Sequence, residues 1–340
     1  RKELQMKKRI FSMVLCAALV LILLAGCGGK AASSSGGDKG KKHKMAYVIS
    51  TVDEFLGFLR DDVEKAAEEK GVEMEFLYAG EDNSRMIDCV AAAKTEGMDA
   101  VLINLNAAEN AHACIEAAGD MKVVFINRVP DDFSYLGENA AAIASDENTS
   151  GVYQGEYLAD LFKKEGKKEV SYVLLRGTEG LVHTDKRTDG ALGTLKDAGI
   201  KLKEAAVVHG NYNRVTARDA FADLLEDGLK FDCIISNNDA MALGAIIAMN
   251  NAGMDPKSVP IVGIDATDDG IEALKAGEMD MTVYQSHEGQ ASGGVQAAIN
   301  MLEGKDIAEG TDCEVSSECP YVLYYPFIPV TADTLDQIKK

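Results

Sequence analysis

The sequence is short of basic residues. It contains 35 Lys and Arg against 55 Asp and Glu, which gives a formal net charge of -20. A protein that binds DNA or RNA needs clustered Lys and Arg to displace counterions from the phosphates. The one strongly basic cluster, Lys7-Lys8-Arg9, directly follows Met6, the first plausible start of translation. A nucleic-acid partner is therefore excluded.

Catalytic motifs are also missing. The sequence has no G-x-G-x-x-G after a strand, no G-x-x-x-x-G-K-[ST], no G-x-S-x-G and no H-E-x-x-H. Its five histidines are scattered, and His287-Glu288 is only a dipeptide. No nucleophile and base can be placed together, so we expect a protein that is not an enzyme and that has no cofactor.

The N-terminal segment indicates export. The uncharged apolar run Ile10–Ala25 follows the basic cluster, as in a secretory signal peptide. Leu24-Ala25-Gly26-Cys27 resembles the lipobox of bacterial lipoproteins, which predicts a signal peptide at 1–26 and an acylated Cys27. An uncleaved anchor is disfavoured because the run is marginal for a membrane span. Residues 27–44 are too polar to fold and predict a flexible tether, so we expect an extracytoplasmic, membrane-anchored protein.

Cysteine usage argues against a disulfide framework. Of seven cysteines, one lies in the signal and one is the expected lipid site, which leaves Cys89, Cys114, Cys233, Cys313 and Cys319. An odd number is not typical of a disulfide scaffold. Cys313 and Cys319 could pair across a hairpin in the tail, although free thiols are the favoured state.

From Met45 onward, short apolar runs alternate with amphipathic helical stretches. Leu56, Leu59, Val63 and Ala66, for example, recur at helical spacing before Gly71. Alternation of this kind predicts parallel strands with helices on both faces of the sheet. Ten strands are predicted, too many for one ordinary sheet, so the fold class is α/β with two doubly wound lobes. The predicted strands are 46–49, 73–77, 100–103, 122–126, 142–144, 169–175, 205–209, 232–235, 259–264 and 281–285.

Ligands of doubly wound sheets bind beyond the carboxyl ends of the strands. The side chains predicted there suit a sugar, which needs carboxylates, amides and a guanidinium for its hydroxyls and aromatic planes for its C–H face. The candidate ligand residues are Asp53, Phe55, Asn104, His183, Arg187, Tyr212, Asn238, Asp265 and Gln285.

Several of these residues have a purely structural alternative. Asp53 and Asn238 could simply cap the helices that follow them, and Asp265 could fix a turn. Phe55 and Tyr212 could belong to the core or the rim, and Arg187 and His183 could be satisfied within the fold. The shared position at strand ends favours the functional interpretation.

Four segments carry a resemblance to a known family. Leu102–Leu105, Val173–Gly177, Ser236–Ala245 and Val262–Ala266 stand where the type I periplasmic sugar-binding proteins keep corresponding segments, above all in the galactose/glucose-binding branch. The chain resembles that family from about Ala46 to Gly304. The resemblance assigns Asp53, Asn104, Arg187, Asn238 and Asp265 as polar sugar ligands and Phe55 as a stacking aromatic.

The chain also departs from the galactose binders. Tyr212 stands where they have a tryptophan, and this chain has no tryptophan at all. His183 replaces an aspartate, and Gln285 replaces an asparagine, as in the ribose branch. The family's calcium loop falls at 163–168, which lacks the spaced oxygens of a calcium site. We therefore expect no metal.

The resemblance also implies a hinge. It predicts one lobe from 45–128 plus 286–311 and a second from 129–285 plus 312–340, joined by three crossings. Asp53, Phe55 and Asn104 would then face Arg187, Asn238 and Asp265 across a cleft that closes on a monosaccharide, as periplasmic binding proteins do.

These features together predict a monomeric, lipid-anchored component that hands galactose or glucose to an ABC importer permease. A sugar-responsive repressor shares the fold class, but it would carry a basic helix-turn-helix ahead of the lobes. A lipoprotein that senses a sugar or a signalling furanose for a membrane receptor remains an alternative, because the sequence does not separate sensor from importer component.

Overall fold

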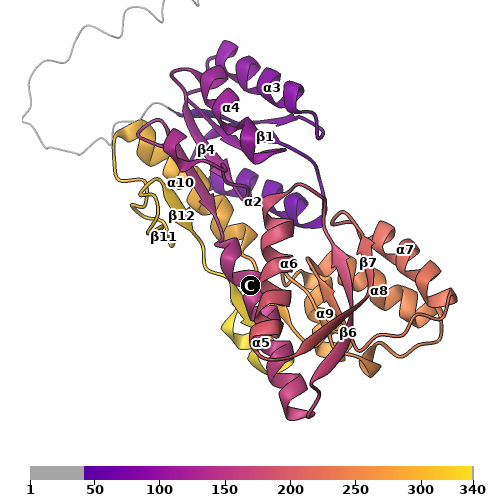
Figure 1. The fold of residues 1–340 in the computed structure, drawn as a ribbon. Helices are drawn as coiled ribbons and strands as arrows, with labels where there is room; N and C mark the ends of the chain where they lie inside the picture. The colour runs from indigo at the N-terminus through magenta and orange to yellow at the C-terminus, as the bar shows by residue number, and fades with distance from the viewer. Residues whose placement is uncertain (1–41, 339–340) are drawn as a thin grey trace, which may run out of the picture. The chain divides into compact units, whose positions relative to one another are not determined.

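The computed structural model describes residues 42–338 (Figure 1). The predicted signal peptide, lipobox, Cys27 and most of the tether lie outside the described residues. The described residues belong to one compact unit. Within the part that is described, no helix combines the length and the apolar character that crossing a membrane requires.

The first sheet has seven strands in the order β11-β12-β5-β4-β3-β1-β2. Its main strands are short apolar runs, and β3 and β5 are buried along their whole length, as expected for parallel strands covered on both faces. All pairings are parallel except that of β11 with β12. The strands are β1 (Lys44–Ile49), β2 (Glu73–Tyr78), β3 (Ala100–Ile103), β4 (Lys122–Ile126), β5 (Ala140–Ala144), β11 (Glu314–Val315) and β12 (Val322–Tyr324).

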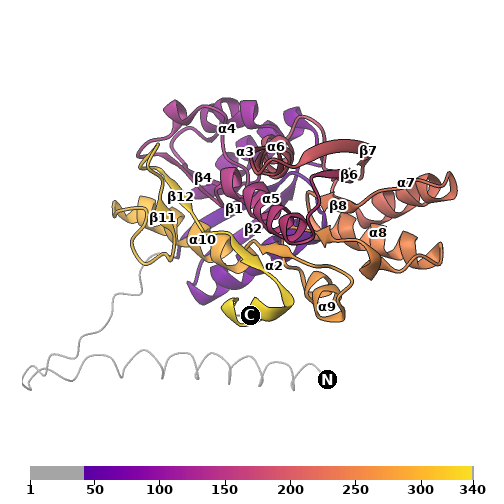
Figure 2. The same cartoon turned by 60° about the horizontal axis from the view of Figure 1, so that its bottom comes forward.

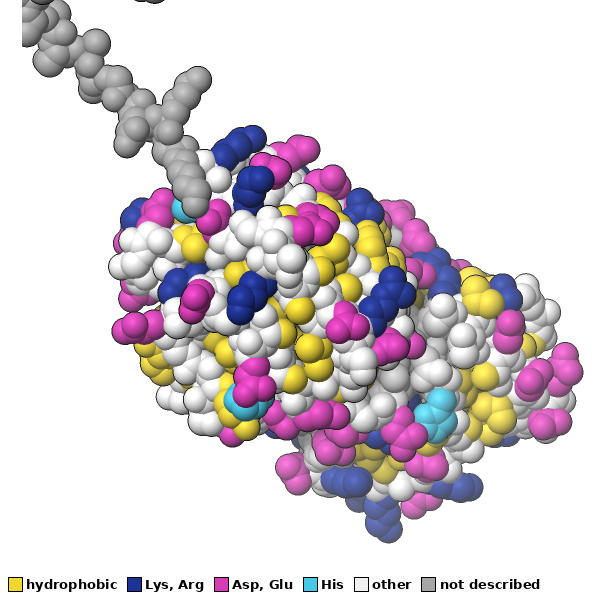
Figure 3. All heavy atoms as spheres, turned by 90° about the horizontal axis from the view of Figure 1, so that it is seen from above, with side chains coloured by type: hydrophobic (Ala, Val, Ile, Leu, Met, Phe, Trp, Pro, Cys, Tyr) yellow, Lys and Arg dark blue, Asp and Glu magenta, His cyan; other side chains and the backbone are white. Residues whose placement is uncertain are grey.

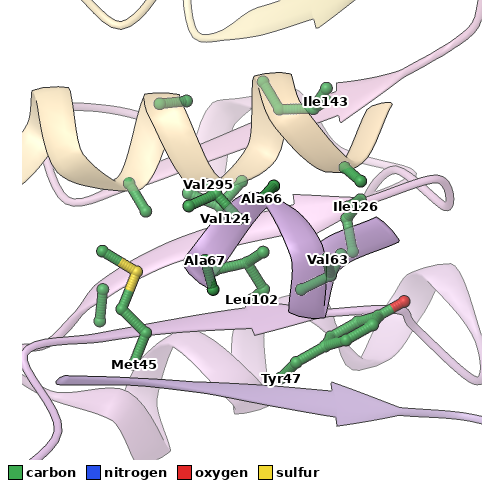
Figure 4. Packing of buried hydrophobic residues seen from close by; sticks show 14 of the residues in the cluster. Met45, Tyr47, Val63, Ala66, Ala67, Leu102, Val124, Ile126, Ile143 and Val295 are labelled. Carbon is green, nitrogen blue, oxygen red and sulfur yellow. The ribbon is translucent and has the colours of Figure 1, made fainter. Parts of the chain in front are cut away.

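Helices cover both faces of this sheet (Figure 1). Helices α2 (Glu54–Glu69) and α10 (His287–Glu303) bury one face, while α3 (Asn83–Thr95) and α4 (Ala111–Ala118) bury the other. Figure 4 shows the first of these layers: Val63 of α2 and Val295 of α10 pack over Leu102 and Val124 of the strands. The first lobe therefore has a core on each side of its sheet.

The second sheet has four parallel strands in the order β7-β6-β8-β9, and isolated bridges connect it to the antiparallel pair β10-β13. Helices α5 and α6 cover one face, and α7 and α8 lie side by side over the other (Figures 1 and 2). The elements are α5 (Glu147–Lys164), β6 (Glu169–Arg176), α6 (Val182–Asp197), β7 (Lys201–His209), α7 (Arg214–Glu226), β8 (Cys233–Ser236), α8 (Asp239–Asn251), β9 (Ile261–Val262), α9 (Asp268–Ala276), β10 (Thr282–Tyr284) and β13 (Ile328–Val330). Short 3-10 helices lie at Ala108–Asn110, Phe133–Tyr135, Pro256–Ser258 and Ala332–Gln337.

The predicted fold class is confirmed, and each of the ten predicted strands corresponds to a strand of the structure. The sheets nevertheless divide the chain differently from the predicted lobes. Strand β5 pairs with β4, and β12 pairs with β5, so both belong to the first sheet. The crossing after β10 lies near 286, as predicted, but the other two follow β5 and β12 instead of lying near 128 and 311. Sheet membership depends on contacts between distant segments, which the local pattern of apolar residues does not specify.

The five cysteines in the described residues are free thiols, so Cys313 and Cys319 do not pair. Burial raises the pKa of the Cys233 thiol to about 12 and that of Cys114 to about 11. These thiols behave as small buried hydrophobes, which is the favoured state predicted from their number.

On the face shown in Figure 3, acidic side chains are spread among basic ones and among small apolar patches. Such a mixed surface agrees with the acidic composition of the chain. It gives that face no basic stripe of the kind that nucleic acids require.

Candidate functional site

Residues from the carboxyl ends of strands in both sheets converge on one small cavity, here called the central cavity. From the first lobe come residues that follow β1 and β4, and from the second lobe come residues that follow β6, β7, β8, β9 and β10, while one residue begins α5. The lining residues are Asp53, Phe55, Leu56, Asn127, Arg128, Glu147, His183, Arg187, Tyr212, Asn238, Asp265 and Gln285. The strand-end rule thus holds for two sheets that face one another.

Eight of the nine predicted ligand residues are in this lining: Asp53, Phe55, His183, Arg187, Tyr212, Asn238, Asp265 and Gln285. Asn104 is the ninth, and it does not line the cavity. Its side chain is fully buried and donates from Nδ2 to the Ile126 carbonyl at 3.2 Å and to Asn127 Oδ1 at 3.3 Å. Asn104 also accepts a hydrogen bond from the Ser50 hydroxyl. It therefore supports the cavity wall from beneath.

Asp53 and Asn238 both cap helices, as the structural alternative proposed, and both also face the cavity. Asp53 Oδ1 accepts from the Leu56 amide at 2.8 Å, and Asn238 Oδ1 accepts from the Met241 amide at 3.0 Å. A cap uses one side-chain atom and fixes the rotamer. The two roles are compatible, because each residue keeps a second polar atom for the cavity.

Three residues of the lining have left-handed backbone conformations. The φ angle is 68° at Asn127, 60° at Tyr212 and 119° at Asp265. Such values are uncommon outside glycine and are unusual for a residue as bulky as tyrosine. Asp265 is held there by hydrogen bonds on both sides, from its own amide to Val283 and from the Gln285 amide to its carbonyl. Strained backbone that clusters around one cavity is a marker of a functional site.

Arg187 is the most tightly held side chain of the site. Its Nε donates to Glu147 Oε2 at 2.9 Å and its Nη2 donates to Glu147 Oε1 at 2.6 Å, which is a bidentate pair. Nη1 donates to the Asn237 carbonyl at 2.9 Å and lies 4.0 Å from Asp265 Oδ1. Although burial lowers the pKa of Arg187, the Glu147 carboxylate outweighs it and the net pKa is raised. Arg187 is therefore a fixed cation.

Arg128 places a second guanidinium in the lining, from the first lobe. Its Nη1 donates to Ser50 Oγ at 3.1 Å and to the Leu105 carbonyl at 2.9 Å. Burial lowers the pKa of Arg128, and the charge of Asp53 opposes that effect. A guanidinium keeps its proton in proteins, so both arginines face the cavity as cations.

The acids of the cavity respond to burial in the opposite way. Burial raises the pKa of Asp265 well above its usual value, and the nearby Arg187 only partly offsets this. Burial also raises the pKa of Asp53, although the hydrogen bond from the Leu56 amide and the charge of Arg128 both act to lower it. Perturbed carboxyls in a cleft are typical of functional sites.

An aromatic wall completes the cavity. The ring of His183 stacks on Tyr212 with centroids 5.2 Å apart, and the Tyr212 hydroxyl bonds to Thr184 Oγ1 at 2.7 Å. Burial, together with Arg128 and Arg187, lowers the pKa of His183 well below its usual value, so the imidazole is neutral. Phe55 of the first lobe also lines the cavity, and its ring makes an edge contact with His287.

Two polar atoms of the lining are buried without a hydrogen-bond partner: Arg128 Nε and Gln285 Nε2. Buried donors are paired in most proteins, and each exception needs an explanation. Gln285 is 1% exposed, and its Oε1 already accepts from Arg187 at 3.2 Å. Acceptor oxygens of a ligand would satisfy both unpaired donors.

The central cavity measures about 30 Å³. This is roughly the volume of one water molecule in the liquid. The lobes are also linked across the cleft by an ion pair between Glu54 and Arg214. A sugar ring could therefore enter only when the lobes or the lining side chains move apart.

Sequence reasoning missed three polar residues of the lining: Asn127, Arg128 and Glu147. Asn127 and Arg128 directly follow β4, at a carboxyl strand end. Glu147 stands three residues after β5, so the same strand-end rule would have found it.

Two doubly wound lobes with a polar cavity between their strand ends define a two-lobed solute-binding protein. A family model described as a periplasmic binding protein domain matches residues 46–306. The chain belongs to this periplasmic binding protein family.

Individual relatives agree with this assignment. The chain is 30% identical to the D-galactose/methyl-galactoside binding periplasmic protein MglB of Haemophilus influenzae, over 85% of this chain and 89% of that protein. It is 27% identical to the ribose import binding protein RbsB of Bacillus subtilis, over 88% of this chain and 95% of that protein. An ABC transporter solute binding protein from Bacillus halodurans with bound myo-inositol shares 25% identity and a TM-score of 0.75, covering 88% of this chain and 98% of that one.

The resemblance to the type I periplasmic sugar-binding proteins of ABC transporters is therefore confirmed. So is the expectation that the chain is not an enzyme, because these relatives are substrate-binding proteins. Membership of the family also implies an extracytoplasmic location.

Proposed function

We propose that this chain captures galactose or glucose between its two lobes by hinge closure and delivers the sugar to an ABC importer. We further propose that it acts as a monomer held at the cell membrane by lipid on Cys27. The ligand would be clamped because it contacts both lobes, which is the condition for a ligand to favour the closed arrangement.

The observation that carries this proposal is the convergence of opposite hydrogen-bonding types on one cavity. Asp53 and Asp265 offer acceptors from opposite lobes, and Arg128 and Arg187 offer donors in the same way. Each sugar hydroxyl is both donor and acceptor, so such a mixed set can satisfy a ring of hydroxyls. The wall formed by Tyr212 and His183 supplies a flat surface for the C–H face of the ring.

The choice of a hexose rests on the relationship to MglB. Other relatives bind other polyols: the names of two of them specify ribose and myo-inositol. Gln285 and the absence of tryptophan depart from the galactose binders. A panel of ligands must therefore include a pentose and a cyclic polyol beside the hexoses.

Calorimetric titration of the mature protein with galactose, glucose, ribose and myo-inositol tests the proposal. We expect galactose or glucose to bind with a dissociation constant at or below about 1 μM, which corresponds to a binding free energy of about -8 kcal/mol. Binding of ribose or myo-inositol alone would overturn the hexose assignment and leave the clamp intact. No binding of any of the four would overturn the proposed function.

A further inference from the structure

A larger cavity adjoins the central cavity, and we call it the side chamber. Its volume is about 430 Å³, and it shares Asn127, Arg128, Glu147 and His183 with the central cavity. The rest of its wall comes from the loops that follow β3 and β4, from the start of α5, from the start of α6 and from the tail at Glu318 and Tyr324. The side chamber is therefore built by both sheets, beside the predicted sugar position.

The two volumes differ in what they can hold. Small-molecule pockets usually span about 300 to 1,000 Å³, and the side chamber lies in that range while the central cavity does not. A monosaccharide clamped by Asp53 and Asp265 would leave the side chamber unfilled. A ligand that occupies both cavities must extend past Arg128 and His183, which line the boundary between them.

Asn106 lines the side chamber and also a neighbouring cavity of about 460 Å³ that contains Asp53, Arg128 and Tyr212. Its Oδ1 and Nδ2 are both buried, and neither atom has a hydrogen-bond partner. Arg128 Nε, at the boundary, is likewise buried and unpaired. An amide that offers one acceptor and two donors is complementary to hydroxyl groups, each of which donates and accepts. Buried groups of this kind are costly unless something binds them.

The remaining wall is apolar and aromatic on one part and acidic on another. Phe133, Tyr324, Pro130 and Val182 contribute carbon surface, which suits the C–H face of a second ring. The charged side chains are mostly acidic, since Asp131, Asp132, Asp146, Glu147 and Glu318 line the chamber against Arg128 and Lys186. An acidic wall disfavours a phosphate or carboxylate on the incoming group.

We propose that the side chamber receives a second, uncharged sugar ring, so that this chain binds a disaccharide whose first ring lies in the central cavity. The proposal rests on the proposed function, because it needs a sugar in the central cavity. Asn106 would bond hydroxyls of the second ring, and Phe133 and Val182 would pack against its carbon face.

The test is a calorimetric titration with galactose, glucose, lactose, melibiose, maltose and cellobiose, and with phenyl β-galactoside as an apolar probe. Two variants fill the side chamber from opposite lobes without touching the central cavity: Val182→Trp and Ala108→Trp. Val215→Trp is the matched control, because Val215 is an exposed valine at the start of α7 and lines neither cavity. Thermal unfolding verifies that each variant is folded.

We expect at least one disaccharide to bind as tightly as its parent monosaccharide or more tightly. Each filling variant should lower the affinity for that disaccharide by about tenfold or more, because the added ring overlaps sterically with the second sugar ring. The same variants should change monosaccharide affinity by less than about twofold. Val215→Trp should change the affinity for the monosaccharide and for the disaccharide by less than about twofold.

Three outcomes overturn the proposal. If monosaccharides bind and no disaccharide binds, the side chamber does not receive a second ring. If a disaccharide binds and both filling variants leave its affinity unchanged, its second ring lies elsewhere. If phenyl β-galactoside alone gains affinity from the chamber, the occupant is an apolar group. Loss of all sugar binding in the unaltered protein would instead defeat the proposed function itself.

Discussion

Arg214 of the second lobe donates from Nη2 to Oε2 of Glu54 in the first lobe at 2.6 Å. The same guanidinium donates from Nη1 to Asp269 Oδ2, within the second lobe, at 2.8 Å. Glu54 stands between Asp53 and Phe55, two residues of the central cavity. An ion pair made by the protein itself therefore holds the lobes together directly beside the proposed sugar position.

Glu54→Gln should weaken sugar binding, because it removes an ion pair that links the two lobes beside the cavity. The pair is partly exposed, so we expect a loss of about 0.2 to 1 kcal/mol, mostly through faster dissociation. Titration and stopped-flow dissociation at low and high salt measure it. Asp269→Asn is the control, since it removes a bond to Arg214 that does not cross the cleft. Equal effects of the two variants would contradict a role in closure.

Asp265→Asn should make the protein more stable at neutral pH. The raised pKa of Asp265 means that the folded state binds more protons than the unfolded state, in which the pKa is about 3.9. Stability contributed by this group is therefore fully present below about pH 4 and is lost as the pH rises through the folded-state pKa.

The melting temperature of Asp265→Asn should exceed that of the wild type at about pH 7, and the difference should vanish toward about pH 4. Differential scanning calorimetry across this range measures the effect, with the exposed Asp269→Asn as control. A lower melting temperature than wild type at neutral pH would mean that the contact with Arg187 outweighs burial.

Gly177→Ala should disturb the aromatic wall. A Cβ on Gly177 would lie 2.1 Å from Cζ of Tyr212, so the ring would have to move away from its stacked position on His183. Overpacking of this kind costs about 1 to 3 kcal/mol, and we expect weaker sugar binding as well as a lower melting temperature. Gly193→Ala in α6 is the control, because nothing lies within 4 Å of its added Cβ. Unchanged sugar affinity in Gly177→Ala would remove Tyr212 from the site.

Cys27→Ser should release the protein from the membrane fraction, because the lipid would have no thiol to which it can attach. Cell fractionation and labelling with a radioactive fatty acid measure the change. Cys16→Ser is the control, since Cys16 lies in the apolar run of the predicted signal. Continued membrane association of Cys27→Ser would contradict the proposed anchor.

The sequence located most of the cavity because a general rule places ligands beyond the carboxyl ends of parallel strands. That rule gives the position of a residue but not the direction of its side chain. Asn104 follows β3 immediately, yet its amide turns beneath the cavity toward Asn127. Arg128 also follows a strand, and its side chain reaches the lining. The difference arises from packing against neighbouring loops, which local sequence does not encode.

The division into lobes was harder to predict for a related reason. Strand β5 is a short run of small apolar residues that could pair with either sheet, and β11 and β12 are short strands of the tail. Their place in the first sheet follows from the pairing of Leu323 with Ile143, residues far apart in the sequence. Contacts of this range become visible only in the folded chain.

The central claim is that one sugar is held by both lobes at once. Titration of the best-binding sugar into Asp53→Asn and Asp265→Asn tests it most directly, because these carboxyls face the same cavity from opposite lobes. We predict that each substitution weakens binding by about 1 to 3 kcal/mol, the cost of leaving a buried hydrogen-bonding group without its partner. Wild-type affinity in either variant would show that the ligand is held by a single lobe and would contradict the clamp.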